Sequence, residues 1–138
     1  MKFYIAARFS KKEQVREIYK KLAEKGHEVH TDWTVHKPIY TYSSDKKLAS
    51  QYAQEDLNGA SGCDVFVLLA DEFSDSGPNK NSTGRGMFIE FGAAILSSIL
   101  NGSPRVFVIG PDNDKAIFHF HPNVTRKNTI DEVLNEIA

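Results

Sequence analysis

Short apolar runs alternate along the chain with segments whose apolar residues recur at helical spacing. This alternation is typical of strands and amphipathic helices that follow one another. The expected strands are Phe3 to Ala7, His27 to His30, Val65 to Ala70, Arg105 to Ile109 and, at an edge, Asn123 to Arg126. The expected helices are a segment from about Val15 that Gly26 closes, one from Ser44 or Asp45 to about Ala60, Gly86 to Leu100, and a short last helix opened by Thr129 to Glu132.

The order of these elements predicts the fold class. Strands that alternate with helices favour a doubly wound parallel sheet, because parallel strands need crossover helices. Roughly five strands favour a flavodoxin-like, three-layer α/β/α fold over a full dinucleotide-binding fold. At 138 residues the chain is expected to form one domain over residues 1–138.

Long irregular stretches predict where a ligand binds. Ligands of such sheets bind beyond the carboxyl ends of the strands. The three longest irregular stretches, 31–44, 71–83 and 110–122, all leave strands at that edge. We therefore expect a ligand site there.

Composition narrows the class of function. The chain has 17 Lys and Arg against 18 Asp and Glu, so no net field attracts nucleic acid or an anionic membrane. The single cysteine, Cys63, excludes an intramolecular disulfide and a cysteine-rich metal site, and it favours a reducing compartment. The apolar runs are short for a membrane span, and the first residues enter a strand pattern rather than a signal peptide. These features predict a cytoplasmic protein without a nucleic acid polymer or a membrane as partner.

Glu90 is an isolated charge on an apolar helix. It is the only ionisable residue between Arg85 and Arg105, and it shares a stripe with Met87 and Ala94 that should face the sheet. Burial of an unpaired carboxylate costs several kcal/mol. Either Glu90 faces a substrate, or it pairs with Arg85 or Arg105 at the rim of the core.

Asp56 repeats this anomaly on the preceding helix. It lies four residues after Tyr52 and four before Ala60, within an apolar stripe that the sequence predicts to be Ala49, Tyr52, Ala53, Leu57 and Ala60. The alternative is an aspartate that braces a neighbouring loop. Two such carboxylates on helices that flank one buried strand favour chemistry, because paired carboxylates in a cleft suit glycosyl transfer.

The chain resembles the nucleoside 2-deoxyribosyltransferase family, including its relatives that hydrolyse deoxynucleoside monophosphates. The resemblance spans nearly the whole chain and lies in Phe3 to Ser10, Gln54-Glu55-Asp56-Leu57, the strand from Val65, and Gly84-Arg85-Gly86 through Glu90-Phe91-Gly92. It implies that Glu90 is the nucleophile that takes the deoxyribosyl group and that Asp56 holds the sugar hydroxyls. It also implies a flavodoxin-like homodimer or higher homo-oligomer whose sites a neighbouring subunit completes. The expected enzyme uses no metal or other cofactor.

The chain departs from the family pattern in two places. The second acid, Asp71 or Asp75, is separated from Glu90 by an enlarged loop, and Asp71 is the catalytic candidate. The first turn keeps Arg8 but lacks the serine of the monophosphate hydrolases, which leaves phosphate recognition open. The expected substrate-binding residues are Tyr4, Ala7, Arg8, Phe9, Trp33, Gly84, Arg85 and Gly86. Trp33 either stacks on a nucleobase or folds onto the domain.

The leading hypothesis is cleavage or transfer at the N-glycosidic bond of a (deoxy)nucleoside or its monophosphate, through a covalent ester on Glu90. Transfer to a second base and hydrolysis share that intermediate. The alternatives are a non-catalytic nucleotide-binding or sensor module of the same fold and an NAD-type glycohydrolase, which also uses a glutamate. His119 and His121 are interpreted as loop or interface residues rather than metal ligands, because no third ligand accompanies them.

Overall fold

The computed structural model describes residues 1–70, 85–110 and 116–138. Its five strands form one parallel sheet in the order β2-β1-β3-β4-β5. The strands are β1 (Lys2–Ala6), β2 (Glu28–Val29), β3 (Val65–Leu69), β4 (Arg105–Ile109) and β5 (Val124–Lys127), and the helices are α1 (Lys12–Glu24), α2 (Lys46–Gly62), α3 (Arg85–Asn101) and α4 (Ile130–Ile137). This order is the flavodoxin-like one, which confirms the predicted fold class.

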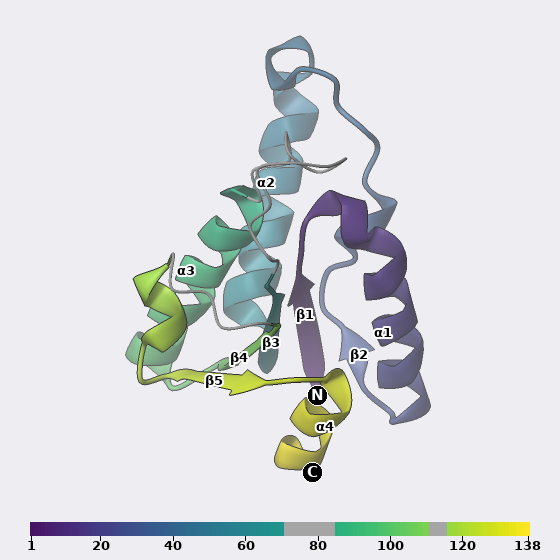
Figure 1. The fold of residues 1–138 in the computed structure, drawn as a ribbon. Helices are drawn as coiled ribbons and strands as arrows, with labels where there is room; N and C mark the ends of the chain where they lie inside the picture. The colour runs from purple at the N-terminus through teal and green to yellow at the C-terminus, as the bar shows by residue number, and fades with distance from the viewer. Residues whose placement is uncertain (71–84, 111–115) are drawn as a thin grey trace.

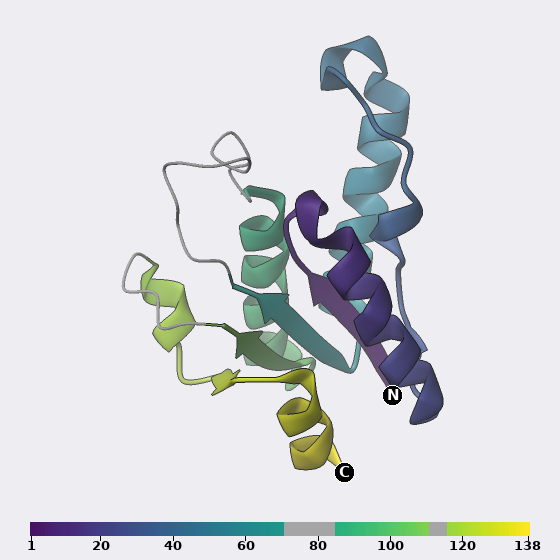
Figure 2. The same ribbon diagram turned by 45° about the vertical axis from the view of Figure 1, so that its right-hand side comes forward.

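The helices form two layers around the sheet. Helices α1 and α4 cover one face, and α2 and α3 lie side by side on the other (Figures 1 and 2). Strand β3 lies between β1 and β4 and is buried along its whole length, as its unbroken apolar run predicts. The core therefore lies on both faces of β1, β3 and β4, and the ends of these strands are held rigidly.

Local side-chain signals define where several elements start and stop. Asp45 caps α2 by accepting a hydrogen bond from the Leu48 N–H at 3.1 Å. Thr129 caps α4 by accepting one from the Glu132 N–H at 3.2 Å. The Glu132 carboxylate in turn accepts from the N–H of Asn128 rather than from that of Thr129. Both caps agree with the sequence pattern.

Helix α2 departs from the predicted apolar stripe. Gly59 and Ala60 are buried, but Ala53 and Leu57 are exposed. The cause is visible in Figure 1, where the first turns of α2 extend past the carboxyl edge of the sheet and have no strand to cover. Helical spacing identifies residues that share a face but cannot tell how far the sheet beneath them reaches.

Two further sequence interpretations can be compared with the structure. Within the described residues, no helix is both long and apolar enough to cross a membrane.

His119 is buried beside Phe88 and Phe91, where its ring contacts theirs. No three histidine, cysteine, aspartate or glutamate side chains come together as metal ligands would in the part of the chain that the structure describes.

Candidate active site

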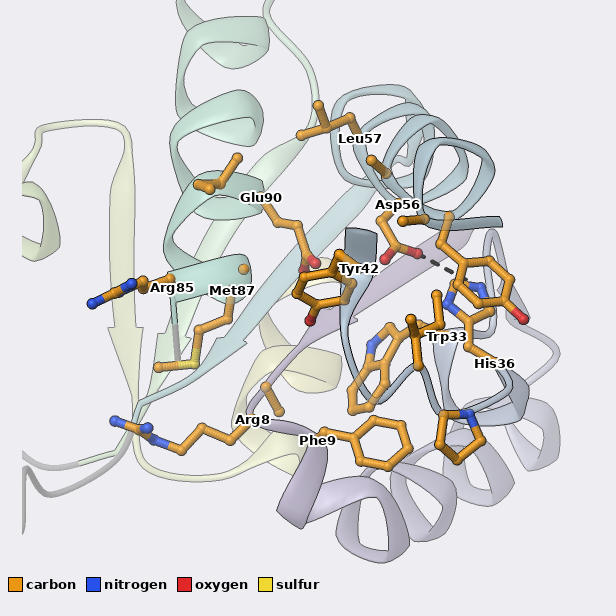
Figure 3. A pocket seen from close by; sticks show the side chains of 18 of the residues that line it. Arg8, Phe9, Trp33, His36, Tyr42, Asp56, Leu57, Arg85, Met87 and Glu90 are labelled. Atoms are coloured by element: carbon orange, nitrogen blue, oxygen red, sulfur yellow. Dashed lines mark ion pairs between the residues drawn. The ribbon is translucent and has the colours of Figure 1, made fainter. Parts of the chain in front are cut away.

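A pocket of about 920 Å³ opens at the carboxyl edge of the sheet. The turn after β1, the loop after β2, α2 and the first turns of α3 form its walls (Figure 3). Among the residues that line it are several expected from the sequence: Ala7, Arg8, Phe9, Trp33, Asp56, Arg85, Gly86 and Glu90. Tyr4 does not line it and lies fully buried in β1. The candidates Asp71 and Gly84, and the alternative acid Asp75, lie outside the described residues.

Glu90 reaches the pocket from α3 because other residues of this helix pack against the sheet. Met87, Phe91 and Ala94 are buried, so the helix presents Glu90 to the end of the sheet rather than to solvent. Its carboxyl and that of Asp56 point toward one another from α3 and α2 (Figure 3). Burial raises the pKa of Glu90 from its usual 4.5 to about 8, and the Asp56 charge adds to this effect.

Asp56 reaches the pocket from α2, where it precedes the buried Gly59 and Ala60 by one helical turn. Its Oδ1 atom is buried and accepts no hydrogen bond from the described residues. Burial raises the pKa of Asp56 to about 6, the nearby His36 lowers it, and Glu55 raises it. Two carboxyls of this kind share protons, so the ionisation steps belong to the Asp56 and Glu90 pair.

Tyr4 lies beneath both carboxyls. Burial, followed by the charges of Glu90 and Asp56, raises the pKa of its hydroxyl far above the usual range. The contact of this hydroxyl with the Glu90 carboxyl lowers the pKa of Glu90, although it does not reach the geometry of a regular hydrogen bond. Tyr4 therefore supplies a neutral polar group that contacts Glu90 from within the core.

Trp33 both folds onto the domain and lines the pocket, so the two interpretations of this residue are compatible. Its Nε1–H donates a hydrogen bond of 2.6 Å to the Ile5 carbonyl at the end of β1. The Phe9 ring lies against the indole, with 6.1 Å between ring centroids. Together these two rings form an aromatic wall beside the two carboxyls.

Two arginines border the same pocket. Arg8 follows β1 and is buried, and Arg85 is the first residue of α3 and is exposed. Their guanidinium ends lie on the same side of the pocket in Figure 3. Within the described part of the chain, Arg85 lies at the pocket edge and forms no ion pair with Glu90.

The sequence analysis missed His36, which contacts the carboxyls of α2. Its Nε2 atom lies 3.5 Å from Glu55 Oε2 and 3.9 Å from Asp56 Oδ1. Its ring stacks on that of Tyr52 at 3.8 Å between centroids. The only signal in the sequence is its position in the 31–44 stretch, three residues after Trp33.

Comparison with known proteins relates the fold to a solved structure. No protein family model matches the sequence, and no curated protein matches it either. The structure is similar to that of the CMP N-glycosidase BcmB of Clostridium botulinum, with a TM-score of 0.58 and 20% sequence identity. The likeness covers 99% of this chain and 98% of that one. At this identity it shows a shared fold.

Proposed function

We propose that this protein cleaves the N-glycosidic bond of a (deoxy)nucleoside or its 5′-monophosphate, with Glu90 as nucleophile. The observation that carries the proposal is the pair of inward carboxyls, Glu90 and Asp56, at one pocket on the carboxyl edge of the sheet. The similarity to a CMP N-glycosidase agrees with this choice of chemistry. The resemblance of the sequence to the deoxyribosyltransferases points to the same bond.

The proposed reaction has two steps. An ionised Glu90 oxygen attacks the anomeric carbon, the bond from that carbon to the base nitrogen breaks, and the electron pair leaves with the base, which takes up a proton. Water, or a second base, then attacks the same carbon and gives up a proton to the Asp71 carboxylate left by the first step, while the bond from that carbon to Glu90 breaks and releases the Glu90 carboxylate. Asp56 accepts hydrogen bonds from the sugar hydroxyls, and Tyr4 supports Glu90 from below. Asp71 is the proposed proton donor to the leaving base.

We propose that the two arginines at the pocket bind the 5′-phosphate of the substrate. Guanidinium groups bind phosphate oxygens in pairs through charge-assisted hydrogen bonds. Arg8 and Arg85 would hold such a group on the side of the pocket where Figure 3 places their ends. The aromatic wall of Phe9 and Trp33 would receive the base. Monophosphates are therefore the preferred substrates of this proposal.

Base release measured by chromatography tests the function. The panel contains deoxynucleosides, ribonucleosides and their monophosphates, CMP among them, with NAD as a further compound and with or without an acceptor base. We expect base release from a monophosphate, and we expect Glu90→Gln and Glu90→Ala to reduce it by at least about a thousandfold, because the nucleophile is lost. Release of nicotinamide from NAD alone would select the glycohydrolase alternative.

The controls separate loss of chemistry from loss of fold. Glu24→Gln changes an exposed glutamate on α1, far from the pocket, and should leave base release unchanged. Both Glu90 variants should retain the far-ultraviolet circular dichroism of the parent protein. Base release that persists in a folded Glu90→Ala variant would defeat the assignment. Thermal stabilisation by nucleotides without any base release would select a nucleotide-binding module.

We also propose that a second copy of this chain covers α2 and α3. Exposed apolar residues follow one face of α3 at helical spacing: Ile89, Leu96, Ile99 and Leu100. Leu57 extends this surface onto the neighbouring α2. Ile89 and Leu57 also line the pocket, so a partner placed on this surface would close one side of the site. A homodimer is the simplest assembly that buries it.

A further inference from the structure

His36 is held in place from several directions. Its own N–H donates to the Trp33 carbonyl at 3.1 Å, which ends the short 3₁₀ turn Trp33–Val35. The Trp33 indole in turn is bonded to the end of β1. On the following residue, the Lys37 N–H donates to the Tyr52 hydroxyl at 2.9 Å. The backbone that carries His36 is therefore fixed to both the sheet and α2.

The imidazole ring is fixed as firmly as its backbone. It lies parallel to the Tyr52 ring, with an angle of 3° between the planes and 3.8 Å between the centroids. Only 15% of its side chain is exposed. This stack leaves one edge of the ring directed at α2, where Nε2 faces the carboxyls of Glu55 and Asp56. Figure 3 shows the ion pair between His36 and Asp56 as a dashed line.

Among the described residues, His36 and Glu55 are the charged groups that shift the pKa of Asp56. The titratable groups that face Asp56 and His36 are Glu55 and Tyr52 from α2, Glu90 from α3, Tyr4 from β1 and Tyr19 from α1, with Lys37 on the same loop. Burial disfavours an ionised Asp56, and the Glu55 charge disfavours it too. His36, whose Nε2 atom lies 3.9 Å from Asp56 Oδ1, opposes both effects and lowers the pKa of Asp56.

We propose that His36 is a positioning residue of this site, whose ring edge faces Asp56 and keeps that carboxylate turned into the pocket. The proposal rests on the proposed function, in which Asp56 accepts hydrogen bonds from sugar hydroxyls. Only the ionised carboxylate offers both of its oxygens as acceptors. His36 does not touch the reacting atoms itself, and it acts through Asp56.

Two variants with opposite expected effects test the proposal. His36→Phe keeps an aromatic ring on Tyr52 and removes the imidazole that lowers the pKa of Asp56, so the Asp56 titration midpoint should rise by about one pH unit. Glu55→Gln removes the neighbouring negative charge, so the same midpoint should fall. The midpoint is measured by NMR on protein with isotope-labelled aspartate carboxyls, and Asp56→Asn assigns the signal. Should the Phe variant fail to fold, His36→Gln replaces it, because it also lacks the imidazole.

Enzyme kinetics give a second readout that packing alone would not change. For base release from the monophosphate that the panel selects, the acidic limb of kcat/KM against pH should move to higher pH in His36→Phe and to lower pH in Glu55→Gln. An Asp56 midpoint that is unchanged in a folded His36→Phe protein would overturn the proposal, whatever the activity. A midpoint that shifts as expected in a protein without base release would support the role of His36 and reject the proposed function alone.

Discussion

At the scale of single residues, burial and the proposed reaction favour opposite protonation states of the Glu90 carboxyl. Burial keeps a proton on Glu90, with a pKa of about 8, while the attack on a sugar needs the ionised form. Asp56 lies beside it with a pKa of about 6, so near neutral pH the pair holds about one proton. The positive charge that develops at the anomeric carbon as the glycosidic bond breaks would favour the ionised form of Glu90 at the moment of reaction.

The Glu90 carboxyl should make stability depend on pH. Between its usual value of 4.5 and the folded value of about 8, the unfolded chain loses this proton while the folded chain keeps it, so rising pH weakens the fold. Glu90→Gln removes this titration. We expect it to raise the free energy of unfolding by about 2 to 4 kcal/mol near pH 9 and by much less near pH 5. Urea denaturation at both pH values measures the difference, and an equal gain at both would contradict the account.

At the scale of elements, the contact between α2 and β1 sets the position of the site. Gly59 is the point of closest approach: a Cβ there would lie 2.7 Å from a ring carbon of Tyr4 and 2.6 Å from the Thr31 hydroxyl. The absence of a side chain lets α2 rest on the Tyr4 ring. Asp56, one turn earlier on the same helix, is thereby brought over the end of β1, next to Glu90.

The Gly59→Ala variant should disturb both the fold and the Tyr4 side chain that contacts Glu90. We expect a loss of about 1 to 3 kcal/mol in the free energy of unfolding, because overpacking outweighs the better helix propensity of alanine. Base release should fall with it, because Tyr4 must move. Gly62→Ala is the matched control in the same helix, where the new Cβ would meet His30 Nε2 at an ordinary 3.5 Å. Equal stability of the two variants would speak against the role of Gly59.

Pattern and spacing in the sequence predict some elements and site residues of this protein but not others. The buried strands and the Asp45 and Thr129 caps follow from local signals, and the structure has them. Glu90 and Asp56 stand out in the sequence because a charge on an apolar stripe is an anomaly. The position of His36 depends on a turn anchored to the sheet and on a ring from another helix, and no local pattern records either contact. Tyr4 is expected from the sequence to bind substrate, but it lies in an unbroken apolar run, where no local pattern shows that its side chain is buried in the core against Glu90 rather than at the pocket wall.

At the scale of the whole molecule, the last prediction is that the apolar surface on α2 and α3 is the interface of a dimer. Leu96→Glu places a charge at the centre of that surface, where Leu96 is 55% exposed, and it should convert a dimer to a monomer. Lys20→Glu also introduces a glutamate, but on α1 at the opposite face of the sheet, and should leave the assembly unchanged. Sedimentation velocity separates the two states. A parent protein that is monomeric at high concentration would exclude the dimer.

The bond between the Trp33 indole and the Ile5 carbonyl gives the protein a built-in optical reporter. The chain has a single tryptophan, so its emission comes from one known place, the aromatic wall of the pocket. A nucleobase that stacks nearby will quench that emission, and a sugar phosphate without a base will not. Occupancy can therefore be titrated with unlabelled protein, in turnover-deficient variants as readily as in the parent.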